Sequence, residues 1–325
     1  MGEPNKGLAY MFQMMNAARL AIGLGAAAIA SAAYYASLEY SQVRLQGRRM
    51  TEKDPATPQI PIIEHADVKR MLLFQRAVVE GSLSLIAQCY RYSDLAMVSE
   101  GDEKERYSLL LDLLTPVAKS YPSEMSIPSV SQGLQILGGY GYCDEFPLEQ
   151  YYRDTRIHPI HEGTTGIHGT TLLGRNVTMK DGRAFQLFLE EVRKTIGAAE
   201  ALDELKPSAH KLREALEHLQ RVTDHLLDIA KEGNREVFLA DATLYLELFG
   251  IITIAWQWLL QAVPVQKTLQ NTDSLSETDA AFYHGKMYTF RYFFGYELPK
   301  ADGLLRRLME TDGLTVEMKA AYFSE

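Results

Sequence analysis

Hydrophobic positions repeat with the period of an α-helix through nearly every long segment of the chain. In the second half, apolar residues recur three or four positions apart, which places them on one helix face. One such stripe consists of Phe185, Phe188, Leu189, Val192 and Ile196, and another of Leu212, Ala215, Leu216, Leu219, Val222, Leu226 and Ile229. No alternating run of convincing strand length is present in the sequence. The pattern predicts an all-α fold built from helical bundles.

The first half of the chain also favours long helices. Residues 14–48 are rich in alanine and contain no proline, so their backbone has strong helix formers throughout. The prolines of TEKDPATPQIPIIEH at 51–65 lack amide hydrogens and fix φ, which predicts an extended connection. Further helices are expected over 66–99, 105–119 and 130–137, with Pro122 and Pro128 bracketing a connection between the last two, and a final helix through Leu172 and Leu173.

The composition changes near residue 180. The stretch RNVTMKDGRAF is polar, and the amphipathic stripes described above follow it. We therefore expect two helical domains, one over residues 1–180 and an additional C-terminal one over residues 181–325, joined at this polar junction.

Charge and cysteine content exclude several classes of protein. Hydrophobic residues make up 46% and charged residues 23% of the chain, as in ordinary globular proteins. The net charge of −9 disfavours a nucleic-acid binder, which usually shows a basic patch or domain. The chain has only two cysteines, Cys89 and Cys143, which fit a reducing cytosol, and no signal segment opens the sequence. We expect a cytoplasmic protein.

Two uncharged stretches are almost long enough to cross a membrane. Residues 20–38 consist mostly of alanine, glycine and serine, and residues 248–266 contain Gln257, Gln261 and Pro264. A spanning helix needs about 20 predominantly apolar residues, and no polybasic flank sets an orientation here. We interpret both as helices of a soluble protein, the second buried on most sides, and expect no membrane span.

The stretch HEGTTGIHGTTLLG at 161–174 combines an acid with glycines and hydroxyls. From the residues alone, Glu162 is a first-turn carboxylate favoured by the helix dipole. A metal interpretation would use Glu162 with His158, His161 and His168. The order HPIHE is not a zinc-protease pattern, and Pro159 disrupts the helical spacing that would align ligands. We predict no metal site.

Three ordered segments resemble the acyl-CoA dehydrogenases, flavoenzymes that desaturate acyl-CoA thioesters. The longest is GLQILGGYGYCDEFPLEQYYRDTRIHPIHEGTTGI at 133–167, and MNAARLAIG at 15–23 and VRLQGR at 43–48 accompany it. The resemblance is strong over residues 1–180 and general over 181–325. It points to the large members of the family, 3-methylmercaptopropionyl-CoA dehydrogenases among them, which carry an extra helical C-terminal domain.

The resemblance implies a chemical role for Glu162. In the family, the glutamate of the EGT motif removes the α-proton of the thioester while the β-hydrogen leaves as hydride to the flavin of FAD, giving a trans-2-enoyl-CoA. Such a base needs a pKa raised towards working pH, and we expect burial to raise it. The protein positions the reactants and the flavin takes the electrons.

The resemblance also implies binding residues. Substrate contacts are expected at Asn16, Arg19, His161 and Gly163. Flavin contacts are expected at Thr164, Thr165 and Gly166, where free amides at the start of a helix suit a phosphate or carbonyl, and, from a neighbouring subunit, at Arg44, Gln46, Gln135, Gly138 and Gly139.

Some of these residues have simpler interpretations. RLQGR is one residue shorter than the usual family pattern and lacks its phenylalanine, which weakens the assignment of Gln46. Without the resemblance, Arg44 is a cation at a helix end, and Arg19 lies at the solvated edge of an alanine-rich helix.

The resemblance further implies partners. They are an acyl-CoA substrate of fatty acid metabolism, an electron-transfer flavoprotein as acceptor, and other copies of the chain in a dimer or tetramer. The family's N-terminal helical and middle β-domains are not found in this sequence, so we expect a fragment or a split-gene half that works with them, on the same or a separate polypeptide. The alternative is a non-catalytic helical oligomerisation module.

Overall fold

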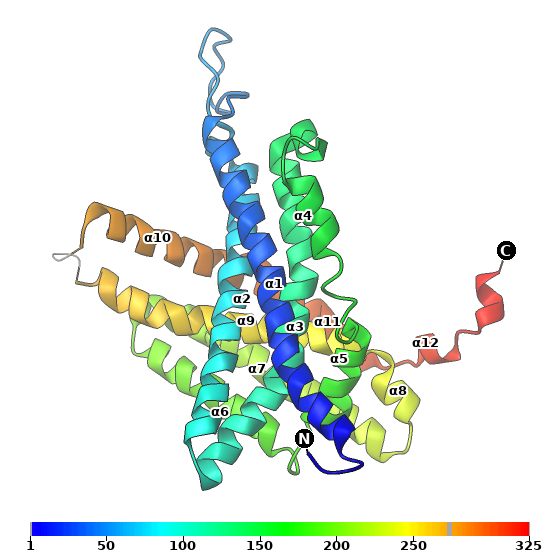
Figure 1. Ribbon diagram of the computed structural model, residues 1–325. Helices are drawn as coiled ribbons and strands as arrows, with labels where there is room; N and C mark the ends of the chain where they lie inside the picture. Colours follow the sequence, from blue (N-terminus) through cyan, green and yellow to red (C-terminus); the bar gives the residue numbers. More distant parts are fainter. Residues whose placement is uncertain (1, 272–274, 325) are drawn as a thin grey trace.

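The computed structural model describes residues 2–271 and 275–324, which form helices and connecting loops without a strand (Figure 1). The all-α prediction is confirmed. The first half contains α1 (Gly7–Val43), α2 (Ala66–Val98), α3 (Gly101–Leu137), α4 (Leu148–Thr155) and α5 (Thr165–Thr171), with short turns η1 (Ile62–Glu64), η2 (Gly138–Tyr142) and η3 (Leu172–Asn176). The second half contains α6 (Arg183–Glu200), η4 (Asp203–Leu205), α7 (Lys206–Lys231), α8 (Arg235–Ala240), α9 (Ala242–Leu269), α10 (Glu277–Tyr292), η6 (Phe293–Glu297), η7 (Leu298–Lys300), α11 (Ala301–Glu310), α12 (Leu314–Glu317) and η8 (Ala320–Phe323).

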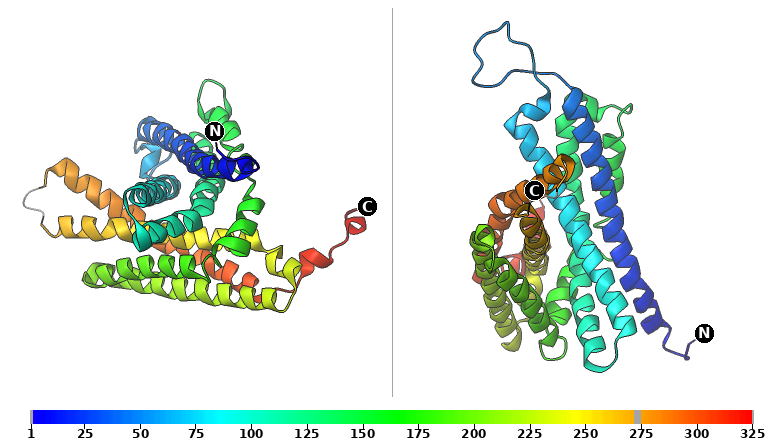
Figure 2. Two further views of the ribbon diagram at one scale, coloured as in Figure 1. Left: turned by 60° about the horizontal axis from the view of Figure 1, so that its bottom comes forward. Right: turned by 90° about the vertical axis from the view of Figure 1, so that its left-hand side faces the viewer.

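Helices α1, α2 and α3 pack side by side, and the helices of the second half pack against α2 and α3 (Figure 2). Small residues make the contact between α1 and α3 close. A Cβ atom at Gly23 would lie 2.1 Å from the carbonyl oxygen of Ala118, so only glycine fits there. Ala26, Ala27 and Ala30 continue the buried face of α1.

The expected break between residues 119 and 130 is wrong. Helix α3 continues from residue 101 to 137 with Pro116, Pro122 and Pro128 inside it. A proline in a helix leaves the carbonyl group four residues earlier without its usual donor. Such a helix persists where other parts of the fold compensate for the lost bond.

The compensation is visible at one of these carbonyl groups. Pro116 frees the carbonyl oxygen of Asp112, which accepts a hydrogen bond from Asn176 Nδ2 at 2.8 Å. The carbonyl oxygen of Ala118, four residues before the next proline, faces Gly23 of α1. A partner distant in sequence, Asn176, therefore helps to stabilise a helix that local signals would end.

The first helix also differs from its predicted bounds. It begins at residue 7 and ends at residue 43, instead of spanning 14–48. Beyond it, the chain is extended, and Leu45 forms an isolated bridge with Pro61. The amide of Gln46 donates to the carbonyl oxygen of Ile60 at 3.0 Å. Pairing with the proline-rich connection replaces the last helical turn.

The second half packs through large side chains. The two predicted stripes are buried, except that Ala215 and Ile229 are only partly covered. Helix α9 packs against helices of both halves. By length and composition alone, α9 and residues Met14–Val43 of α1 could cross a membrane, but 78% of the α9 window is buried inside the protein, as in a core helix.

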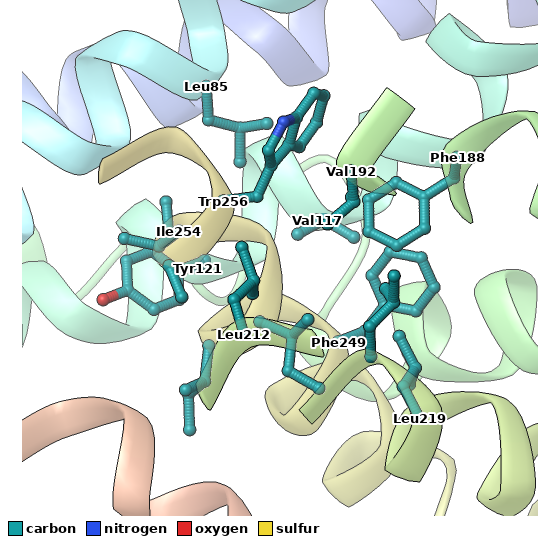
Figure 3. Close-up of a cluster of buried hydrophobic side chains, with 14 of the residues drawn as sticks. Leu85, Val117, Tyr121, Phe188, Val192, Leu212, Leu219, Phe249, Ile254 and Trp256 are labelled. Atoms are coloured by element: carbon teal, nitrogen blue, oxygen red, sulfur yellow. The ribbon is translucent and has the colours of Figure 1, made fainter. Parts of the chain in front are cut away.

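One buried cluster extends across the junction near residue 180. Leu85 and Val117 from the first half meet Phe188, Phe249 and Trp256 from the second (Figure 3). Helix α5 also reaches the second half, because a Cβ atom at its Gly169 would lie 2.6 Å from the carbonyl oxygen at residue 242. The division into two domains at residue 180 stays a prediction, since the apolar core is continuous over it.

Candidate active site

The loop before α5 presents Glu162 in a left-handed backbone conformation. Glu162 has φ of 56° and Gly163 has φ of 95°, a region that residues with a side chain rarely adopt. A Cβ atom at Gly163 would also lie 2.9 Å from His168 Nε2. Glycine therefore suits this position both for its backbone freedom and for its lack of a side chain.

The side chain of Glu162 is exposed, which corrects the expectation that it is buried. The described residues leave the carboxylate uncovered. The loop directs the backbone inwards, where two buried side chains hold it, and leaves the carboxylate available to another molecule.

Two buried donors hold consecutive carbonyl groups of this loop. Lys119 Nζ, from α3, donates to the carbonyl oxygen of Gly163 at 2.8 Å. His168 Nε2, from α5, lies 3.3 Å from the carbonyl oxygen of Glu162. Both donor side chains are 0% exposed. The backbone around Glu162 is therefore held by hydrogen bonds from two buried side chains, one on α3 and one on α5.

Burial changes the pKa of both donors. The pKa of Lys119 is lowered to about 8, mainly because burial disfavours the charged form, with Glu124 and Glu162 opposing the shift and Arg19 adding to it. Burial, with the positive charges of Lys119 and Arg19, lowers the pKa of His168 to about 4. At neutral pH the imidazole is therefore uncharged.

The tautomer of His168 follows from its contacts. A carbonyl oxygen only accepts, so we assign the proton to Nε2. The other ring nitrogen, Nδ1, is buried and has no hydrogen-bond partner in the described residues. A neutral ring protonated on Nε2 is consistent with both observations.

Arg19 and Asn16 lie beside this loop on α1. Arg19 Nη1 donates to Asn16 Oδ1 at 3.2 Å, and both line a cavity of about 190 Å³ together with Arg175. Arg19 is half-buried rather than at a solvated edge. Burial lowers its pKa, and the carboxylate of Glu162 opposes that shift. The cation is thus within electrostatic reach of the acid.

The predicted flavin contacts at the start of α5 are only partly free. Thr164 is exposed at the N-cap and Gly166 is exposed in the first turn. However, the amide of Thr165 donates to the carbonyl oxygen of Pro159 at 3.2 Å, and its hydroxyl donates to Glu124. The expectation of free amides is therefore wrong at Thr165, because the tight loop uses that amide itself.

The histidines near this loop bond to the backbone. His158 Nδ1 lies 3.1 Å from the carbonyl oxygen of Thr155, and half-buried His161 places Nδ1 3.0 Å from that of Ile157. Their ring centroids are 5.8 Å apart. Over residues 2–271 and 275–324, no group of three His, Cys, Asp or Glu side chains could hold a metal ion.

The remaining predicted residues meet in a second cavity. Arg44, Gln46, Gln135, Gly138 and Gly139 all line a cavity of about 800 Å³. It lies where α1 and α3 end, at the top of Figure 1, whereas α5 lies in the lower half. The structure therefore places these five residues away from the loop that carries Glu162.

This second cavity suits an anionic ligand with a planar or extended body. Arg44 supplies an exposed cation at the C-cap of α1, and Gln135 supplies an exposed amide. A Cβ atom at Gly138 or Gly139 would meet nothing within 4 Å, so backbone is accessible there. Arginine matches phosphate oxygens in geometry and charge. The helix-end interpretation of Arg44 also holds, since the two roles are compatible.

Sequence reasoning missed Lys119 and gave His168 only a place in a metal site. A signal for Lys119 was present, because it is the only charged residue between Asp112 and Glu124. An isolated charge in an apolar helical run is either solvated or bound to a specific partner. No comparable signal distinguished His168 from the other histidines.

Two family models match the chain. Residues 5–177 match the model described as acyl-CoA dehydrogenase, C-terminal domain. Residues 188–319 match the model described as acetyl-CoA dehydrogenase C-terminal like.

Curated relatives agree with these matches. A 3-methylmercaptopropionyl-CoA dehydrogenase of Ruegeria pomeroyi is 34% identical over 95% of this chain and 52% of its own length. A butyryl-CoA dehydrogenase of Syntrophomonas wolfei is 30% identical over 98% of this chain and 52% of its own length. The chain therefore spans about half the length of these relatives.

Solved structures share the fold. Caenorhabditis elegans ACDH-11 in complex with C11-CoA has a TM-score of 0.71 at 21% identity, over 92% of this chain and 46% of that one. An acyl-CoA dehydrogenase of Bacillus anthracis complexed with FAD has a TM-score of 0.67 at 19% identity, over 98% of this chain and 52% of that one. Because the family model over residues 5–177 covers more than half of the chain, this protein belongs to the acyl-CoA dehydrogenase family and corresponds to its C-terminal helical part.

Proposed function

We propose that this chain supplies the catalytic base of an FAD-dependent acyl-CoA dehydrogenase, and that Glu162 is this base. The observation that carries the proposal is the exposed Glu162 carboxylate on a left-handed loop whose backbone is held by Lys119 and His168. Such a loop fixes the position of an acid without covering it. A merely structural glutamate has no need of an anchored, strained backbone.

The proposed step removes two hydrogens from the substrate. A Glu162 carboxylate oxygen takes the α-proton of the thioester, and the carbon–carbon double bond of a trans-2-enoyl-CoA forms as the β-hydrogen leaves with its electron pair. Bound FAD supplies the acceptor for that hydride. Asn16, Arg19, His161 and Gly163 would surround the acyl-CoA, with Arg19 within electrostatic reach of Glu162.

The residues present also fit FAD. The cation, amides and accessible glycines of the 800 Å³ cavity suit a diphosphate and its attached rings. Arg44, Gln46, Gln135, Gly138 and Gly139 would hold the FAD of a neighbouring subunit, while Thr164, Thr165 and Gly166 would contact that of their own. The separation of the 800 Å³ cavity from the start of α5 along the bundle supports contacts to two flavins.

The remaining partners follow from the same proposal. The complete enzyme would combine this chain with the portion of its relatives that it does not span, on the same or a separate polypeptide. It would self-associate through residues 1–180, pass electrons to an electron-transfer flavoprotein and act in the cytoplasm. The presence of Glu162, Gly163 and Thr164 favours this enzyme over a non-catalytic oligomerisation module.

The substitution Glu162→Gln tests the proposal in the complete, flavin-loaded enzyme. The amide is nearly the same size but cannot accept the α-proton. We expect acyl-CoA and FAD to stay bound while the rate of flavin bleaching by saturating acyl-CoA without oxygen falls by roughly 10²–10⁴. The bleaching rate reports the chemical half-reaction alone.

The matched control is Glu217→Gln, which makes the same change at an exposed residue of α7. It should leave bleaching unchanged. If Glu162→Gln bleached its flavin at the parent's rate, another residue would be the base.

A further inference from the structure

Lys119 is an unusual residue for the interior of a helical bundle. Its side chain is 0% exposed and ranks among the largest that are fully buried. In the part of the chain that the structure describes, no carboxylate lies within the ion-pairing distance of 4.0 Å from its ammonium group. Burying a charged ammonium is costly unless specific contacts compensate. Among the described residues, the ammonium group makes one hydrogen bond, to the carbonyl oxygen of Gly163, 44 residues away.

The second donor acts on the adjacent peptide group. His168 donates to the carbonyl oxygen of Glu162 at 3.3 Å. The carbonyl groups of Glu162 and Gly163 therefore both bond to donors from helices on the inner side, while the Glu162 side chain is exposed. This arrangement fixes the orientation of two consecutive peptide planes.

The loop needs such support because its conformation is unfavourable by itself. Two consecutive positive φ angles, at residues 162 and 163, include one at a residue with a side chain, for which the left-handed region is unfavourable. Strained conformations persist where the surrounding structure holds them. A hydrogen bond from a charged donor is stronger than one between neutral groups, so Lys119 is the stronger of the two anchors.

We propose that Lys119 is a positioning residue, whose ammonium group fixes the Gly163 carbonyl and thereby aims the Glu162 carboxylate at the substrate. This inference rests on the proposed role of Glu162 as the base. It assigns Lys119 no contact with the substrate and no proton transfer. A displacement of about 1 Å in a reacting group can cost 10²-fold in rate, so loss of this anchor should slow the chemical step.

The first experiment measures the loop itself in the flavin-free chain. Lys119→Met removes the charge and the donor while keeping a long apolar stem. We expect amide hydrogen exchange of residues 161–168 to accelerate by roughly 10–100-fold, with exchange in α6 and α7 unchanged. Lys104→Met, the same change at an exposed residue of α3, should leave both segments unchanged.

The second experiment measures the rate in the complete, flavin-loaded enzyme. Lys119→Met should slow flavin bleaching by roughly 10–100-fold while the dissociation constant for acyl-CoA stays within about twofold. Lys119→Gln, whose amide can still donate to the Gly163 carbonyl, should recover part of that loss. A residue that only stabilised the bundle would lower the melting temperature without this selective effect on rate and loop exchange.

The outcomes separate the two proposals. Parental loop exchange and bleaching rate in Lys119→Met would overturn the positioning role. If that variant does not fold, Lys119→Leu, which also lacks a donor, decides, and parental values there would overturn it equally. Parental bleaching in Glu162→Gln would instead remove the base assignment, whereas the loop-exchange result does not depend on which residue is the base.

Discussion

The two halves of the molecule are packed in opposite ways. In residues 1–180, α1 and α3 approach closely over Gly23 and buried alanines, and most of the buried polar side chains of the described chain lie in this half. In residues 181–325, rings fill the interior, with the centroids of Phe188 and Phe249 4.7 Å apart and those of Phe188 and Trp256 5.8 Å apart.

This difference in packing places the candidate site in residues 1–180 and most of the buried rings in residues 181–325. Close packing of α1 on α3 brings the helices near the loop of Glu162, and Lys119 of α3 bonds to a backbone carbonyl of that loop. The buried rings of residues 181–325 stabilise that half through the hydrophobic effect. Helix α9 joins the two by packing against helices of each.

The largest expected effect is the loss of stability when a buried ring is removed from residues 181–325. Phe249→Ala should lower the free energy of unfolding by roughly 3–5 kcal/mol, because it removes a buried ring and leaves a cavity. Urea unfolding of the chain measures the change. Phe282→Ala, at a side chain that is 51% exposed, is the matched control and should have a much smaller effect. Equal losses in the free energy of unfolding would mean that the buried rings around Phe249 do not contribute more to stability than exposed ones.

The next largest effect is a pH dependence of stability that arises from His168, in residues 1–180. The pKa of His168 is about 4 in the folded chain, below the value of about 6.5 for an unfolded histidine. The unfolded chain therefore binds more protons between these two pKa values. The contribution of His168 to the free energy of unfolding is thus full above pH 6.5 and is lost as the pH falls towards 4. Its contribution over this window is about 3 kcal/mol.

Urea unfolding of the parent and of His168→Gln at pH 7 and pH 4 tests this contribution. The variant should lose less stability on acidification than the parent. Some dependence should remain, because burial also lowers the pKa of His158. Identical losses in the two proteins would contradict the assignment of a buried neutral His168.

The smallest expected effect is the stability change on replacing a glycine by alanine, which should have opposite signs at the α1–α3 contact and in α6. Gly23→Ala should destabilise the chain by roughly 1–3 kcal/mol, because the new methyl group meets the carbonyl oxygen of Ala118. Gly197→Ala, in α6 with nothing within 4 Å of its Cβ position, should stabilise it by roughly 0.5–1 kcal/mol. Thermal melting of both variants measures the pair, and equal signs would show that the α1–α3 contact is looser than described.

The sequence predicted helices well where amphipathic stripes defined them. The stripes of α6 and α7 are buried as expected because their periodicity reflects the core they face. The bounds of α3 could not be predicted, since the partners of its freed carbonyl groups, such as Asn176 for Asp112, are far away in sequence. Proline is a local signal, and tertiary contacts overrode it.

The site was predictable to the extent that its residues form a motif. Glu162 and Gly163 were found because they are adjacent within a recognisable stretch. Lys119 was not, because it acts on a backbone carbonyl 44 positions away, and backbone contacts leave no pattern in the sequence. The exposure of Glu162 was also not predictable from the stretch that contains it.

The prolines of α3 also affect how the chain becomes functional during synthesis. An isolated helix with three internal prolines has lost several of its own hydrogen bonds and nucleates poorly. It needs α1, made earlier, and Asn176, made later. Because Gly169 of α5 then packs on the start of α9, a ribosome must pass residue 242 before the loop that carries Glu162 has all its neighbours. A truncated or stalled chain would thus lack an assembled site.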